Sequence, residues 1–140
     1  MQFYVERDVP MPMRDGVILR ADIYRPSEDG EYPALLTRIP YNKSSAQSTG
    51  APMVNPIQGP ERGYVIVVQD TRGRFTSDGE FVPFYTEADD GYDSVEWVAK
   101  QEWCNGKVGI YGNSYLGVTV RQAVVSNPPH LEAAVAYLTG

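Results

Sequence analysis

The sequence contains 140 residues, of which 42% are hydrophobic and 21% are charged, and its formal net charge is -6. This length allows one domain with a sizeable core, because domains usually contain roughly 100 to 200 residues. The excess of 18 acidic over 12 basic residues disfavours a nucleic-acid partner, since such affinity depends largely on Lys and Arg. No apolar run approaches the roughly 18 to 20 residues of a membrane-spanning helix, so we expect no membrane association.

The N-terminus and the single cysteine indicate the cellular compartment. Residues 1–8 contain no basic segment followed by an apolar one, so no secretory signal is visible and the sequence predicts a cytoplasmic protein. Cys104 is the only cysteine, which excludes an internal disulfide and a multi-cysteine zinc site within one chain. We expect Cys104 to be a small packing residue.

The strand signals change character along the chain. Residues 5–12 and 17–24 flank a short polar turn, and the alternation of apolar and mostly polar side chains in 17–24 predicts an antiparallel hairpin. Residues 44–60 are polar and rich in Gly and Pro, which predicts a loop with room for a short helix. Four later runs are short and almost continuously apolar, as in parallel strands buried on both faces: 34–36, 64–68, 108–111 and 133–138.

Two helices are predicted among the later strands. The first spans about residues 87–100, with Thr86 as its cap, Asp89 completing a capping box and further acids suiting the helix dipole. The second spans about 115–126 and ends at the prolines that follow Asn127. Strands that alternate with helices imply right-handed crossovers and an α/β fold with helices on the faces of a parallel sheet.

The strongest chemical signal lies between the 108–111 strand and the second helix, in the segment Gly112-Asn113-Ser114-Tyr115-Leu116-Gly117. It resembles a nucleophile elbow, in which a serine sits on a strained strand-to-helix turn and the next backbone amide, here that of Tyr115, stabilises an oxyanion. The spacing departs from G-x-S-x-G because Leu116 occupies the second small position. The alternative is an ordinary glycine-rich turn without catalysis.

Further segments resemble one family in the same order. Together with the serine segment they are similar to the cocaine-esterase-like acyl esterases, which are related to X-prolyl dipeptidyl peptidases; the segments are 12–17, 38–43, 69–73 and 77–81. The resemblance implies an α/β-hydrolase fold and an acyl-enzyme formed on Ser114. It also implies that the hydroxyl of Tyr41, in the loop after the 34–38 strand, joins the Tyr115 amide in the oxyanion hole. No cofactor or metal is implied.

Several other residues have structural and functional interpretations. The acids at the start of the first helix suit its dipole better than a cation site. Asp70 and Arg72 follow a strand at the catalytic edge; we expect an ion pair that orders the loop rather than substrate contact. The aromatic residues Trp97, Trp103 and Phe84 are expected in the core rather than in an acyl pocket.

The residues that would complete a catalytic triad are not evident. His130, the only histidine, follows the second helix, which carries the chain roughly 18 Å away from Ser114, so we expect a surface residue. The resemblance places the acid and the histidine after further strands and a cap insertion. Residues 1–140 are therefore predicted to be the N-terminal part of an α/β-hydrolase catalytic domain, up to about its sixth strand.

This prediction leaves alternatives open. The chain is expected to be a fragment, a truncated product or part of a split enzyme, with negligible activity alone. Its 133–138 strand would expose an apolar edge suited to self-association or to a partner chain. The predicted substrate is a small-molecule ester, with an X-prolyl dipeptidyl peptidase activity as the alternative. An inactive interaction module is the competing class.

Overall fold

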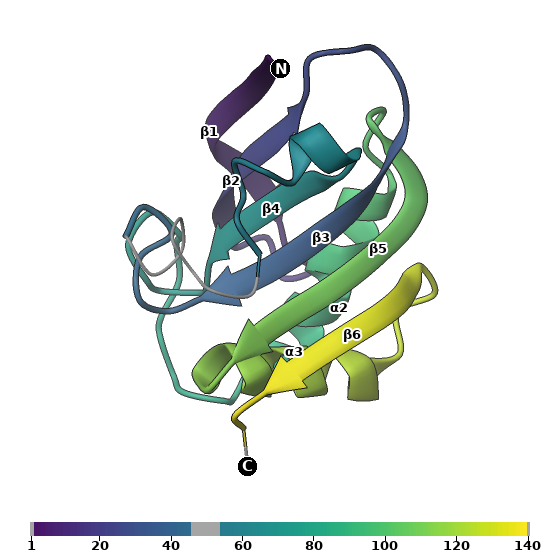
Figure 1. Cartoon of the computed structure of the whole chain (residues 1–140). Helices are drawn as coiled ribbons and strands as arrows, with labels where there is room; N and C mark the ends of the chain where they lie inside the picture. Colours follow the sequence, from purple (N-terminus) through teal and green to yellow (C-terminus); the bar gives the residue numbers. More distant parts are fainter. Residues whose placement is uncertain (1, 46–53, 140) are drawn as a thin grey trace.

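The computed structural model describes residues 2–45 and 54–139, and its chain begins with the predicted hairpin (Figure 1). Strands β1 (Phe3–Pro12) and β2 (Ile18–Pro26) pair antiparallel. The pairing register shifts between Glu6 and Val9, where two residues of β1 face one residue of β2. This is a β-bulge, and the periodicity of the sequence gave no sign of it.

The described residues form one six-stranded sheet with the order β1-β2-β4-β3-β5-β6. Strands β3 (Tyr32–Ile39), β4 (Val65–Asp70), β5 (Cys104–Asn113) and β6 (Leu131–Tyr137) run parallel to one another. Their carboxyl ends therefore lie at one edge of the sheet (Figure 1). The four apolar runs are confirmed as strands, and the α/β class is confirmed with them.

Helices α2 (Glu87–Ala99) and α3 (Tyr115–Ser126) agree with the predicted spans to within one residue. Both pack against the same face of the sheet (Figure 1), and they approach each other so closely that a Cβ on Gly91 would lie 2.8 Å from the Cβ of Ala123. In the described residues, the opposite face is covered by a loop that contains Val54 and the short helix η1 (Pro60–Arg62). The expected helices therefore cover one face only.

The main core lies between the sheet and the two α-helices. It contains apolar side chains from β1 to β5 and from both helices, with Trp97 and Trp103 packed against it. Cys104 belongs to it and is 6% exposed, so the core positions predicted for these three residues are confirmed. Strand β6 differs from the prediction, because only its first residue is even partly buried. It pairs with β5 alone and therefore forms an edge.

The start of α2 also differs in detail from the prediction. Thr86 is the N-cap residue, but its side chain makes no capping hydrogen bond. Its backbone carbonyl accepts the first hydrogen bond of the helix, from the amide of Asp90. The capping box is therefore wrong, because the acids of the first turn are engaged with arginines elsewhere in the fold.

Residues 46–53 of the predicted loop lie outside the described residues. Within the part that is described, no helix is long and apolar enough to cross a membrane.

Candidate active site

Ser114 occupies a sharp turn between the end of β5 and the first residue of α3. Its backbone angles are φ 52° and ψ -122°, a combination that non-glycine residues rarely adopt because of steric strain. The Ser114 amide donates a 3.0 Å hydrogen bond to the carbonyl of Tyr137, and the Ser114 carbonyl accepts one of 3.2 Å from Val118. These bonds hold a strained residue whose side chain is exposed at the carboxyl edge of the sheet. This is the geometry of a nucleophile elbow.

The two glycines of this segment accommodate different neighbours. A Cβ on Gly112 would lie 2.4 Å from the Cβ of Leu116, so a larger residue there would clash with the first turn of the helix. A Cβ on Gly117 would lie 2.8 Å from the Cβ of Thr139, just beyond β6. The departure from G-x-S-x-G thus has a physical explanation. The Leu116 side chain packs over Gly112. The second glycine, Gly117, leaves room for Thr139 in the chain after β6.

Tyr115, directly after the turn, joins the elbow to an aromatic loop. As the first residue of α3, it carries a backbone amide that lacks a partner inside the helix. Its ring stacks on Phe84 with centroids 5.0 Å apart, and its hydroxyl accepts a 3.2 Å hydrogen bond from the Phe84 amide. Burial raises the pKa of the Tyr115 phenol, and the nearby Tyr41 phenol acts in the same direction to a smaller extent.

Phe84 is not a core residue, so that prediction is wrong. Its side chain is 52% exposed and its φ is 67°, a second strained backbone position beside the elbow. Phe81 also approaches Tyr115, with ring centroids 6.1 Å apart. Sequence spacing could not separate these phenylalanines from core aromatics, since their loop contacts a helix about 30 residues later.

Tyr41 lies in the loop that leaves the carboxyl end of β3, on the same sheet edge as Ser114. Its side chain is 46% exposed, which leaves the phenol accessible. The loop around it is fixed, because the Pro40 carbonyl accepts a 2.8 Å hydrogen bond from Arg74 and the Lys43 amide donates one of 2.8 Å to Asp70. Tyr41 is therefore an exposed side chain on an ordered loop.

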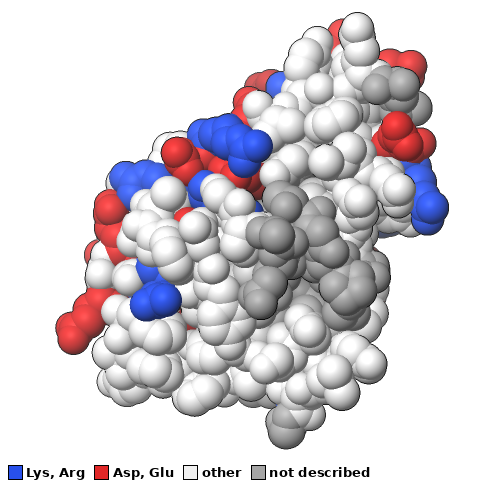
Figure 2. All heavy atoms as spheres, turned by 60° about the vertical axis from the view of Figure 1, so that its left-hand side comes forward, with Lys and Arg blue, Asp and Glu red and all other residues white. Residues whose placement is uncertain are grey.

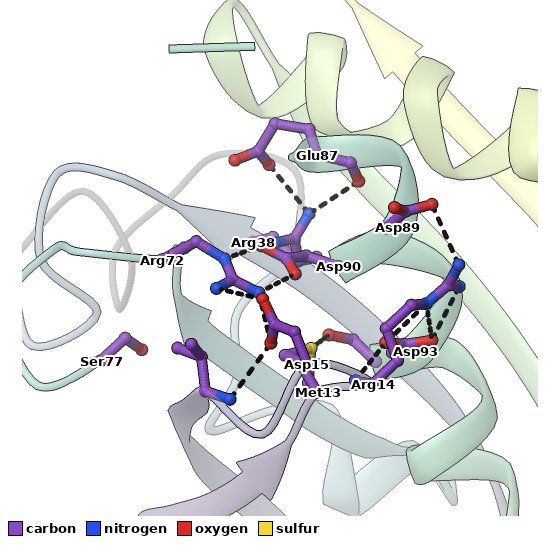
Figure 3. A network of polar contacts seen from close by, with 12 residues as sticks. Met13, Arg14, Asp15, Arg38, Arg72, Ser77, Glu87, Asp89, Asp90 and Asp93 are labelled. Carbon is purple, nitrogen blue, oxygen red and sulfur yellow. Dashed lines mark hydrogen bonds and ion pairs between the residues drawn. The ribbon is translucent and has the colours of Figure 1, made fainter. Parts of the chain in front are cut away.

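A buried network of ion pairs lies behind this edge (Figure 3). Arg38 of β3 is 0% exposed and donates to Gln69 and to Glu87, whose carboxylate lies 2.9 Å away. Arg72 contacts Asp90 through two hydrogen bonds, of 2.9 and 2.7 Å, and pairs with Asp15 over 2.9 Å. These bonds connect β3, the loop after β4, the start of α2 and the hairpin turn.

The expected ion pair between Asp70 and Arg72 is not what the structure contains. Asp70 accepts hydrogen bonds from the Lys43 amide and from both the amide and the hydroxyl of Thr76. Arg72 pairs with Asp90 and Asp15 instead. Both residues order loops, as predicted, but neither is the ion-pair partner of the other.

The acids of α2 pair with arginines, so the helix dipole alone does not explain them. Besides the two acids of the buried network, Asp89 and Asp93 lie 3.1 and 2.9 Å from the guanidinium of Arg14. Among the described residues, no group of three or more His, Cys, Asp and Glu side chains could hold a metal ion.

His130 lies at the opposite edge of the sheet from Ser114. Its carbonyl accepts a hydrogen bond from Val108, near the start of the buried part of β5, and its ring contacts Glu96 at 2.9 Å. The side chain is 46% exposed. The predicted surface position is confirmed, and His130 is not placed to act as a base for Ser114.

Figure 2 turns the side carrying the loops after β3 and β4 toward the viewer. Basic and acidic side chains alternate along one flank, and the lower part of this face is mostly uncharged.

The fold and the elbow together define an α/β hydrolase. Residues 15–140 match the X-Pro dipeptidyl-peptidase (S15) family, and the chain belongs to this family.

Individual relatives include an esterase and other hydrolases. The chain is 46% identical over 131 residues to a cocaine esterase from Rhodococcus, a match that covers 94% of this chain. Among solved structures, a CocE/NonD family hydrolase from Staphylococcus aureus superimposes with a TM-score of 0.91 at 31% identity over 99% of this chain. An α-amino acid ester hydrolase gives a TM-score of 0.83 at 31% identity, again over 99% of this chain.

The chain spans only part of these relatives. It covers 23% of the cocaine esterase, 28% of the staphylococcal hydrolase and 25% of the α-amino acid ester hydrolase. The expected resemblance to the N-terminal portion of such hydrolases is confirmed.

Proposed function

We propose that this chain supplies the nucleophile and the oxyanion hole of a serine esterase that hydrolyses carboxylic esters. The observation that carries the proposal is the strained, exposed Ser114 at the N-terminus of α3, with Tyr41 on an ordered loop at the same sheet edge. Esters rank before peptides because the cocaine esterase shares 46% identity with this chain. The family description keeps X-Pro dipeptidyl peptidase activity as the second candidate.

The proposed reaction has two steps. The Ser114 hydroxyl oxygen attacks the ester carbonyl while a base takes its proton, and the carbonyl oxygen becomes an oxyanion. The Tyr115 amide, aided by the helix dipole, and the Tyr41 hydroxyl donate hydrogen bonds to it. The alcohol leaves with a proton, and water then releases the acid from the acyl-serine in the same way.

The base and its orienting acid are proposed to lie outside residues 1–140. His130 is the only histidine, and it lies at the opposite sheet edge. The residues described here would then form the N-terminal part of a catalytic domain, up to its sixth strand. The isolated chain is expected to turn over an activated ester at a negligible rate compared with a complete enzyme.

The edge of β6 is proposed to pair with a further strand of the same longer polypeptide. Val135 and Tyr137 are 53% and 54% exposed, and Leu138 beyond them is 72% exposed, although an apolar parallel strand is normally covered. The relatives are about four times longer than the chain, as a coverage of 23% implies. A stable complex with a different polypeptide would instead support an interaction module, and concentration-dependent self-association would support pairing between copies.

The function is tested on the natural gene product that carries this sequence, with p-nitrophenyl acetate and an X-prolyl p-nitroanilide as competing substrates. Faster turnover of the ester, lost in Ser114→Ala, is the expected result. Preference for the anilide would favour the peptidase alternative, and full ester turnover by Ser114→Ala would refute the proposed nucleophile.

A further inference from the structure

We infer that Lys43 is a positioning residue for Tyr41, and that the bulged hairpin of β1 and β2 holds the Tyr41 loop through the Lys43 side chain. The inference rests on the proposed role of Tyr41 in the oxyanion hole. It adds a function for the N-terminal hairpin beyond its contributions to the sheet, to the core and to the ion pairs with Arg72.

The Lys43 side chain is enclosed, although it belongs to a loop at the sheet edge. It is only 2% exposed, and its ammonium lies 2.8 Å from the carboxylate of Asp22 and also bonds to Asp8. Asp22 is itself 0% exposed and belongs to the middle of β2. A lysine two residues after Tyr41 therefore reaches across the sheet into the hairpin.

The β-bulge in β1 shapes this binding site. Arg7 and Asp8 together face Asp22, and Asp8 adopts a φ of 53°. The Asp8 amide donates to one oxygen of Asp22 over 3.0 Å, and Arg7 donates to the other oxygen over 2.8 Å. Bulges commonly redirect a side chain, and this one turns the Asp8 carboxylate toward the Lys43 ammonium.

The backbone of Lys43 is held as well, by a residue outside the hairpin. The Lys43 amide donates to Asp70, whose second oxygen accepts from Thr76. Asn42, between Tyr41 and Lys43, has a φ of 87° and closes a tight turn through a 3.0 Å hydrogen bond from the Ser44 amide to its side chain. With only one residue between them, a shift of Lys43 displaces Tyr41 as well.

The ammonium remains charged in this setting. Burial favours the neutral amine, but the hydrogen bonds with Asp22 and Asp8 outweigh it and raise the pKa of Lys43. A neutral side chain of similar length would remove the buried cation of Asp22 and leave only the exposed guanidinium of Arg7 as its partner, which is unfavourable. Charge as well as length therefore suits lysine to this position.

The expected consequence is catalytic, because an oxyanion donor acts only when it is correctly placed. Misplacement of a catalytic group by about 1 Å can lower a rate by about 10²-fold. Loss of the Lys43 anchor should therefore lower kcat more than it changes KM, and it should do so through the Tyr41 hydroxyl.

A double-mutant cycle in the natural gene product tests this coupling. Tyr41→Phe, Lys43→Met and the combination are compared by kcat for p-nitrophenyl acetate, with folding checked by thermal unfolding. Tyr41→Phe alone is expected to lower kcat about 10²- to 10³-fold, and its effect should shrink at least about tenfold when Lys43 is replaced. Arg25→Met is the control, because it removes a hairpin cation that pairs with Glu6 rather than with the loop.

Asp8→Asn is a second, milder variant, which keeps the test valid if Lys43→Met does not fold. It keeps the buried pair between Lys43 and Asp22, and asparagine tolerates the positive φ. In this background the Tyr41→Phe effect should shrink about threefold, as expected for weakening one ion pair whose carboxylate is half exposed.

The outcomes separate the two claims. If Tyr41→Phe lowers kcat by the same factor in every folded background, the inference about Lys43 is overturned while the role of Tyr41 stands. If Tyr41→Phe does not change kcat in the otherwise unaltered protein, the proposed oxyanion role fails and the inference fails with it. A reduced Tyr41→Phe effect with Lys43→Met or Asp8→Asn, and an unchanged one with Arg25→Met, supports the inference.

Discussion

The amide of Ser114 donates a 3.0 Å hydrogen bond to the carbonyl of Tyr137, so the end of β6 supports the turn that carries the proposed nucleophile. The chain just after β6 also contacts the first turn of α3, where Thr139 lies against Gly117. The strained φ of 52° at Ser114 is thus stabilised by contacts from a strand that follows it in sequence. The elbow is a tertiary feature as well as a local one.

Gly112→Ala should disable the elbow. The new Cβ would lie 2.4 Å from the Cβ of Leu116 and 2.7 Å from the Leu116 carbonyl carbon, so the first turn of α3 must move. We expect a loss of about 1 to 3 kcal/mol in the free energy of unfolding and a fall of about 10²-fold in kcat. Ester hydrolysis and thermal unfolding of the natural gene product measure both.

Gly91→Ala is the matched control for that substitution. It creates a similar clash, 2.8 Å from the Cβ of Ala123, between α2 and α3 and outside the elbow. Stability should fall, and kcat of the folded protein should change far less. Equal losses of kcat in both variants would contradict the special role of Gly112.

Glu87→Gln should destabilise the fold strongly. Arg38 and Glu87 have side chains that are 0% and 2% exposed and lie 2.9 Å apart, so the substitution leaves a buried guanidinium without its closest anion. We expect a loss of about 3 to 5 kcal/mol, whereas Glu6→Gln, in the exposed pair with Arg25, should lose about 0 to 1 kcal/mol. Denaturant unfolding of the two variants compares these losses, and similar losses would argue against the importance of the buried network.

Acid should weaken the contact between the hairpin turn and the loop after β4. The hydrogen bond with Arg72 lowers the pKa of Asp15 below its ordinary value. The folded state thus binds this proton less readily than the unfolded state. The ionised Asp15 carboxylate stabilises the folded state fully above the unfolded pKa of about 3.9. This stabilisation is lost as pH falls through the lower folded pKa.

Asp15→Asn tests this pH dependence through thermal midpoints measured between pH 6 and pH 3. The variant should have a lower midpoint at pH 6 and a smaller further drop on acidification than the unaltered protein. Asp29→Asn, in the exposed turn after β2, should keep the original profile. An unchanged profile in Asp15→Asn would show that the pair with Arg72 contributes nothing measurable.

Local patterns predicted the elements well because they depend on neighbouring residues. The alternation of apolar and polar side chains in 17–24 predicted β2, and the prolines after Asn127 predicted the end of α3. The strand order could not be predicted in this way. Strand β3 lies between β4 and β5, and that pairing follows from packing contacts between distant segments.

The candidate site was predicted only in part for the same reason. Ser114 and Tyr115 lie in one recognisable segment, whereas Tyr41 was predicted only from the family resemblance. Asp90 and Glu87, the helix carboxylates that bind Arg72 and Arg38, lie 18 and 49 residues away in sequence, so no spacing reveals them. The buried Lys43 could not be anticipated either, because a lysine beside a polar loop ordinarily points to water.

The most direct test of the proposed serine chemistry is covalent labelling of the natural gene product with a fluorophosphonate, followed by mass spectrometry of its peptides. We predict one adduct, on Ser114, with loss of ester hydrolysis in proportion to labelling and no adduct in Ser114→Ala. Full hydrolytic activity after complete labelling of Ser114, or inactivation through an adduct on another residue, would contradict Ser114 as the nucleophile.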